Sequence, residues 1–340
     1  KRISREDFMK QFDLNTDELQ DLLNESIPIE LIPAILEGET ARQGAQRLRS
    51  VFHTITATSR RTGQGETTVN DETDGFAIVG RKAAVLHNLF ADERVNLKTA
   101  SLPRRSKWYT TLEALKDMAR EYLTHVKPGL AGRWNTEHPI HPEEEEIEEG
   151  RKSFFEFLDH MGNLPIFTHL DNLKEKGEDP RSTAIDRQRL FPISNLEHQG
   201  YEGGHLLMRP TGQIILAKAV GKLVSEGEAL KNIFRKLEEL DMHRRFSQHR
   251  PENLWYGVTY DFSENKMKTR VPEWAHELLM YLVRGAGAEE REELVQLVME
   301  ARDSGTPEDP KWRNFKGQDV KYNLLDASEQ FPPSLAQQDN

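Results

Sequence analysis

Residues 110–126, TTLEALKDMAREYLTHV, have the pattern of a helix with one buried face. Their apolar residues recur three and four positions apart, which is the spacing of one helical face. Thr110 and Glu113 stand at capping-box spacing and are expected to begin the helix. Lys127-Pro128-Gly129 is expected to end it, because this sequence is typical of a helix end. The apolar face consists of Leu112, Leu115, Ala119, Tyr122, Leu123 and Val126.

The same spacing recurs on both sides of this stretch. Thr40 and Gln43 form a second capping box, and the helix that it opens extends to about Thr56. Further helices are expected over residues 4–23, 76–90, 153–161, 213–224, 229–240, 273–284 and 289–302. Short strands are expected at residues 28–32 and in a hairpin formed by residues 256–261 and 266–270. The sequence therefore predicts an α+β protein that is mostly helical.

Composition divides the chain into four parts. Residues 133–150 contain His-Pro-Ile-His-Pro followed by six glutamates, and we interpret them as an acidic linker. This places one domain at residues 1–132 and a mainly helical C-terminal domain at residues 151–304. Residues 305–340 are rich in Pro, Gln and Asp and are expected to form a loosely packed tail.

Composition also excludes several classes of protein. The chain has no cysteine, which excludes disulfides, thiolate metal sites and a cysteine nucleophile. No apolar run approaches the roughly 18 residues that a membrane helix needs, so we expect no membrane partner. The first four residues, KRIS, lack the apolar core of a signal peptide, which favours a cytoplasmic location. A net charge of -11 argues against coating nucleic acid with the whole surface, but it allows local contact.

Basic residues are clustered within this acidic chain. Residues 40–65 contain five arginines and no acidic residue, and a second cluster lies beside Trp108 and Tyr109. A third cluster spans residues 243–250. Arginine forks bind phosphate oxygens, so we predict DNA contact through these clusters, unless they are only solvated helix faces and polar loops. The predicted DNA-binding residues are Arg42, Arg49, Arg60, Arg61, Arg104, Arg105 and Lys107.

Asp71 and Asp74, which flank Glu72, are the candidate catalytic residues. Carboxylates are ligands that Mg²⁺ prefers, but Asp and Gly are also common in loops, and Asp74 would then pair with Arg81 along one helix face. His138 and His141 are further metal candidates, although they lie in the predicted linker. No P-loop sequence is present. We therefore assign no metal site, and Mg²⁺ or a nucleotide stays open as a cofactor.

Three stretches carry a family resemblance. They are residues 51–62 (VFHTITATSRRT), residues 74–110, which include SLPRRSKWYT at 101–110, and residues 206–213 (LLMRPTGQ) with NLWYG at 253–257. In this order they resemble the DndB family of DNA sulfur-modification proteins, which shares an Asp-Gly-Gln-His-Arg (DGQHR) motif. That motif itself is expected just before Lys1. Thr56 stands where the family usually has asparagine.

The resemblance implies both a fold and a function. The family's N-terminal part is similar to the ParB/sulfiredoxin-like fold, so an α/β portion of that kind is expected within residues 1–132, with a large helical extension. The implied function is that of a DNA-binding accessory or regulatory protein of a phosphorothioation-type modification system, with modification enzymes of the same operon as partners. One alternative is a ParB-like nucleotide hydrolase or DNA nickase that uses Asp71 and Asp74. Another is a non-catalytic protein-interaction subunit, and a homo-oligomer stays open.

Overall fold

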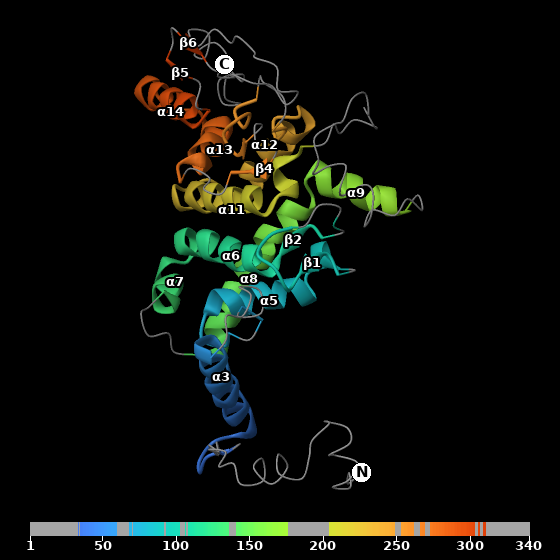
Figure 1. The fold of residues 1–340 in the computed structure, drawn as a ribbon, viewed down its shortest axis with the longest axis vertical. Helices are drawn as coiled ribbons and strands as arrows, with labels where there is room; N and C mark the ends of the chain where they lie inside the picture. Colours follow the sequence, from blue (N-terminus) through green and yellow to red (C-terminus); the bar gives the residue numbers. More distant parts are fainter. Residues whose placement is uncertain are drawn as a thin grey trace, which may run out of the picture. The chain divides into compact units, whose positions relative to one another are not determined.

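The computed structural model describes residues 33, 35–59, 68–69, 71–91, 93–102, 106, 108–135, 141–175, 204–248, 253–261, 266–268, 273–302, 305–306 and 309–310. Contacts divide the chain into two units, residues 1–48 and 49–340. The described part is mostly helical, as predicted, with a small parallel sheet (Figure 1). Its ten α-helices are α3 (Ala41–Ser59), α5 (Gly75–Leu86), α6 (Leu112–Val126), α7 (Pro128–Trp134), α8 (Glu144–Gly162), α9 (Pro165–Glu175), α11 (Pro210–Ser225), α12 (Leu230–Met242), α13 (Ala275–Arg284) and α14 (Ala288–Ala301).

Helix α6 packs against both α5 and α11 in the larger unit (Figure 1). Its apolar face is buried in a core that these helices share with α8 and α13. Glycines allow both neighbours to approach the α6 backbone. A Cβ atom at Gly80 of α5 would lie 3.1 Å from the Lys116 nitrogen, and one at Gly221 of α11 would lie 3.0 Å from the Tyr122 oxygen. Residues 110–126 therefore form the helix around which the larger unit is assembled.

This helix begins one residue later than predicted. The cap of α6 is Thr111, whose Oγ1 accepts a hydrogen bond from the Ala114 N–H at 3.1 Å. Thr110 instead pairs with Val95 in the parallel sheet. The predicted capping box of Thr110 and Glu113 is therefore wrong, because the strand continues to Thr111 and its last extended residue becomes the cap.

The capping box that begins α3 is confirmed. Gln43 Oε1 accepts a hydrogen bond from the Thr40 N–H at 2.9 Å, and Thr40 Oγ1 accepts one from the Gln43 N–H at 3.3 Å. The helix extends to Ser59, three residues beyond the predicted end. At this position the polar pair identifies the start of the helix from sequence alone.

The second half of the predicted acidic linker is helical. Residues 144–150 form the beginning of α8, where Glu146 Oε2 accepts a hydrogen bond from the Glu143 N–H at 3.3 Å. Acidic side chains in the first turn of a helix are favourable because they face the positive end of its dipole. Ile147 and Gly150 are buried, so the glutamate run opens a packed helix.

Helices from both sides of that linker share one hydrophobic core. Trp134 of α7 lies against two glycines, and a Cβ atom would fall 2.2 Å from its ring at Gly75 and 2.5 Å from it at Gly150. Its ring also meets Phe76 edge-on, with centroids 5.2 Å apart. α6, from the predicted first domain, packs along α11, from the predicted second one.

The described strands are short. β1 and β2 are parallel, with Val95 opposite Thr110 and Asn96 opposite Thr111. β3 and β4 form the predicted hairpin, and β5 and β6 form another in the predicted tail. Their bounds are β1 (Val95–Asn96), β2 (Thr110–Thr111), β3 (Tyr260–Asp261), β4 (Lys266–Met267), β5 (Gly305–Thr306) and β6 (Asp309–Pro310).

Two predicted elements, the helix at residues 4–23 and the strand at residues 28–32, lie outside the described residues. No helix in the described ranges combines the length and apolar character needed to cross a membrane.

Candidate functional site

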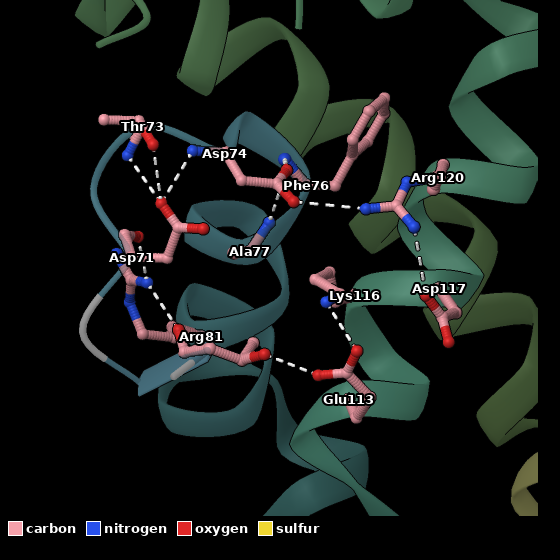
Figure 2. A network of polar contacts seen from close by, with 11 residues as sticks. Asp71, Thr73, Asp74, Phe76, Ala77, Arg81, Glu113, Lys116, Asp117 and Arg120 are labelled. Carbon is pink, nitrogen blue, oxygen red and sulfur yellow. Dashed lines mark hydrogen bonds and ion pairs between the residues drawn. The ribbon is translucent and has the colours of Figure 1, made fainter. Parts of the chain in front are cut away.

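The predicted carboxylates Asp71 and Asp74 lie together before α5, and both bind main-chain N–H groups. Asp74 Oδ1 accepts hydrogen bonds from Phe76 at 2.8 Å and Ala77 at 3.2 Å, which makes it the N-cap of α5 (Figure 2). Asp71 Oδ1 accepts hydrogen bonds from the N–H groups of Thr73 at 2.9 Å and Asp74 at 3.0 Å. The two carboxylates therefore fix the loop and the start of the helix.

A cation from α6 neutralises the cap. Asp74 Oδ2 lies 3.1 Å from Arg120 Nη2, and Arg120 also pairs with Asp117 at 3.3 Å. The same guanidinium lies 5.4 Å from the centroid of the Phe76 ring. The predicted pairing of Asp74 with Arg81 is wrong, because the packing of α6 on α5 brings Arg120 to the cap instead.

Arg81 of α5 binds the loop that precedes its own helix. Its Nη1 donates to the main-chain oxygens of Thr68 at 2.8 Å and Asp71 at 2.5 Å, and its Nη2 lies 3.2 Å from Glu72 Oε1. Burial lowers the pKa of Arg81, and the negative charges of Glu72 and Asp71 oppose that effect. Arg49 Nη1 lies 3.5 Å from the same Glu72 oxygen. Glu72 therefore pairs with both the mostly buried guanidinium of Arg81 and the exposed guanidinium of Arg49.

Glu113 of α6 makes a second connection to this loop. Its Oε2 accepts a hydrogen bond from Thr68 Oγ1 at 2.5 Å, and its Oε1 lies 2.5 Å from Lys116 Nζ (Figure 2). In addition, Nδ1 of the predicted metal candidate His141 lies 2.5 Å from the main-chain oxygen of Glu72. The polar network thus ties Thr68 and residues 71–74 to α5, to α6 and to the segment before α8.

Caps and ion pairs occupy the carboxylates of this network. Both oxygens of Asp74 have partners, whereas a metal ligand or a general base needs a lone pair directed at an open position. Across the described ranges, no three His, Asp or Glu side chains are grouped so that they could hold a metal ion. The geometry therefore supports a structural role for Asp74, which fastens α5 to α6.

The structure describes two of the seven residues predicted to contact DNA. Arg42 and Arg49 both lie on α3 with exposed side chains, and Arg42 belongs to the smaller unit. A neighbouring arginine, Arg47, is bound by Glu39 at 2.8 Å and by the main-chain oxygen of Pro33 at 2.9 Å. The other predicted residues, Arg60, Arg61, Arg104, Arg105 and Lys107, lie outside the described residues. That these seven residues contact DNA stays a prediction.

Sequence reasoning missed the role of Gln213. Its buried side chain donates from Nε2 to the main-chain oxygens of Tyr109 at 3.0 Å and Leu207 at 2.8 Å. The preceding Gly212 is required, because a Cβ atom there would lie 2.1 Å from the Leu206 oxygen. The available signal was a glycine–glutamine pair in the first turn of a helix that begins with proline.

Two buried histidines were also missed. His205 Nε2 lies 3.0 Å from Asp241 Oδ1, and Asp241 Oδ2 accepts a hydrogen bond from the Ile166 N–H at 2.9 Å. His276 Nδ1 lies 2.7 Å from the main-chain oxygen of Glu273, and burial lowers the pKa of His276 to about 4. The contacts of His205 and Asp241 are non-local, so sequence spacing gives no sign of them.

Comparison with known proteins gives no significant match to a family model, to a curated protein or to a solved structure. The resemblance to the DndB family therefore rests on the three stretches quoted above.

Proposed function

We propose that the chain is a DNA-binding accessory or regulatory protein of a phosphorothioation-type DNA modification system. The observation that carries the proposal is the chemistry of α3. In a chain of net charge -11, this 19-residue helix has no acidic residue, and it presents the side chain of Arg49 with 66% of its surface exposed. An exposed guanidinium on a helix without acids is suited to phosphate oxygens.

The contact between Gln213 and Tyr109 supports the family part of the proposal. Tyr109 is the penultimate residue of the second stretch of the resemblance, and Gln213 ends the main part of the third one, 104 residues after Tyr109. Stretches that belong to one family fold are expected to pack together. The proposal includes a ParB/sulfiredoxin-like α/β portion within residues 1–132 and modification enzymes of the same operon as partners.

Salt dependence of DNA binding tests the predicted phosphate contacts. Each phosphate contact contributes about 0.9 to the slope of log affinity against log salt. Replacing both Arg60 and Arg61 with alanine is therefore expected to flatten the slope by about 1.8, as measured by fluorescence anisotropy of a labelled duplex. Arg235→Ala, which removes an exposed arginine of α12 outside the predicted clusters, is the matched control. An unchanged slope in the Arg60/Arg61 double variant would reject their role.

The net charge of -11 favours one alternative, a non-catalytic protein-interaction subunit. A negative surface repels nucleic acid and keeps a protein soluble. In that case the protein would capture purified modification enzymes of its operon, yet fail to shift a duplex even at low salt. Binding of duplex by the isolated protein would exclude this alternative.

A further inference from the structure

One oxygen of Glu72 is shared by two guanidinium groups. Arg81 Nη2 lies 3.2 Å and Arg49 Nη1 lies 3.5 Å from Glu72 Oε1. The two arginines come from different helices, α5 and α3. Burial lowers the pKa of Arg81, and the nearby positive charge of Arg49 acts in the same direction. The single carboxylate therefore holds two cations that repel each other.

The two arginines are held unequally. The Arg81 side chain is 18% exposed and also donates to the main-chain oxygens of Thr68 and Asp71. The Arg49 side chain is 66% exposed, and across the described ranges Glu72 is the only acid that pairs with it. A distance of 3.5 Å is long for a hydrogen bond, and exposed ion pairs contribute little to stability. Another anion can thus easily displace Glu72 from Arg49.

We propose that Glu72 occupies Arg49 in the free protein, and that a phosphate of the DNA backbone replaces Glu72 when DNA binds. This inference rests on the proposed function and specifies how that function is regulated. Glu72 keeps Arg81 as its partner, so the exchange leaves no carboxylate without a cation. Every charge stays paired, because Arg49 gains the phosphate. Glu72 therefore acts as an internal competitor that lowers DNA affinity.

The chemistry of α3 favours a nucleic-acid phosphate over an acidic peptide. In the sequence, five hydroxyl residues follow Arg49 up to residue 59: Ser50, Thr54, Thr56, Thr58 and Ser59. Hydroxyls and guanidinium forks together are typical of contacts to the DNA backbone. A duplex presents one phosphate charge per about 1.7 Å of its axis, which suits a segment of this composition.

Affinity for a short labelled duplex tests the exchange in a double-mutant cycle of Glu72→Gln and Arg49→Ala. Glu238→Gln, which removes one exposed acid of α12, controls for the change in net charge. Because an exposed pair contributes little, Glu72→Gln is expected to tighten binding about two- to fivefold relative to Glu238→Gln. The same substitution made in the Arg49→Ala background is expected to give no gain in affinity beyond that of Glu238→Gln.

Three results would overturn the exchange. One is an equal Kd for Glu72→Gln and Glu238→Gln, and another is tightening that persists without Arg49. The third is a larger gain for a polyglutamate peptide than for the duplex, which would identify an acidic peptide as the partner. If wild-type protein binds no duplex at low salt, the proposed function fails as well. If it binds but shows no Arg49-dependent gain, only the exchange fails.

A measurement on the unmodified chain covers the case in which Glu72→Gln does not fold. The Nε–H resonances of arginine side chains report changes of partner by NMR. Addition of duplex is expected to shift the Arg49 resonance and to leave that of Arg81 in place. An Arg49 resonance that does not move while DNA binds would overturn the exchange.

Discussion

The side-chain nitrogen of Gln213 lies 3.0 Å from the main-chain oxygen of Tyr109, although 104 residues separate the two positions. The same nitrogen donates to Leu207 at 2.8 Å. The first turn of α11 is thereby joined to the residue that precedes β2 and α6. Buried main-chain oxygens need hydrogen-bond donors, and one glutamine supplies two of them.

Gln213→Ala is expected to lower the free energy of unfolding by about 1–3 kcal/mol, because it leaves two main-chain acceptors without this donor. Urea unfolding measures the loss. Gln296→Ala, at an exposed position of α14, is the matched control and is expected to change stability by less than about 0.5 kcal/mol. Equal stability of the two variants would contradict the structural role of Gln213.

Gly75→Ala is expected to destabilise the protein by about 1–3 kcal/mol, because its Cβ atom would lie 2.2 Å from the Trp134 ring and overpack the core. Gly132→Ala lies in α7 with nothing within 4 Å of the new atom, and is expected to gain up to about 1 kcal/mol from helix propensity. We expect the urea midpoint to fall for Gly75→Ala and to rise for Gly132→Ala. A Gly75→Ala variant as stable as wild type would show that Trp134 does not pack as described.

Asp74→Ala is expected to cost about 1–2 kcal/mol, because α5 loses its N-cap. Asp74→Asn is expected to cost less, since asparagine caps helices as well as aspartate does and only the charge that faces Arg120 is lost. Chemical denaturation of the two variants measures this order. Equal costs for the two variants would indicate that the charge facing Arg120 contributes more than the cap.

The asparagine variant also tests the enzymatic alternative. Wild type and Asp74→Asn are incubated with Mg²⁺, ATP or CTP and supercoiled DNA, and nucleotide hydrolysis and nicking are followed. A structural role for Asp74 predicts the same result for both proteins. Turnover that disappears in a stably folded Asp74→Asn variant would make Asp74 a catalytic residue.

Stability is expected to fall in mild acid because of His276. Burial lowers its pKa from 6.5 to about 4, so between these values the unfolded chain binds a proton that the folded protein does not. Stability is therefore complete above about pH 6.5 and decreases by up to about 3 kcal/mol as pH approaches 4. His276→Gln is expected to lose less stability than wild type over this interval, with His243→Gln, at an exposed position, as the control. Equal losses of stability for wild type and His276→Gln would show that His276 does not cause the decrease in acid.

Helical periodicity predicted most of the described helices, because burial of one apolar face controls helix formation locally. The boundaries depended on tertiary contacts. Thr110 has a side chain that can cap a helix, but it pairs with Val95 in the sheet, and Thr111 caps α6 instead. The glutamates from residue 143 onward have the composition of a linker, but Ile147 and Gly150 are buried against the core and make them the start of α8.

The candidate site was predictable in part. The carboxylates Asp71 and Asp74 do lie together, because they are only three positions apart in one loop. Their partner Arg120 was not predictable, since only the packing of α6 on α5 brings it to the cap. For the same reason Glu72 was grouped with metal ligands, whereas in the fold it is bound by Arg81 and Arg49.

The salt dependence of wild-type DNA binding tests the central claim most directly. If all seven predicted residues contact phosphates, log affinity for a duplex falls against log salt with a slope of about -6. Fluorescence anisotropy between about 50 and 200 mM salt measures this slope. A steep linear decrease is the predicted result. No binding at the lowest salt, or an affinity that does not change with salt, would contradict a phosphate-binding surface on this protein.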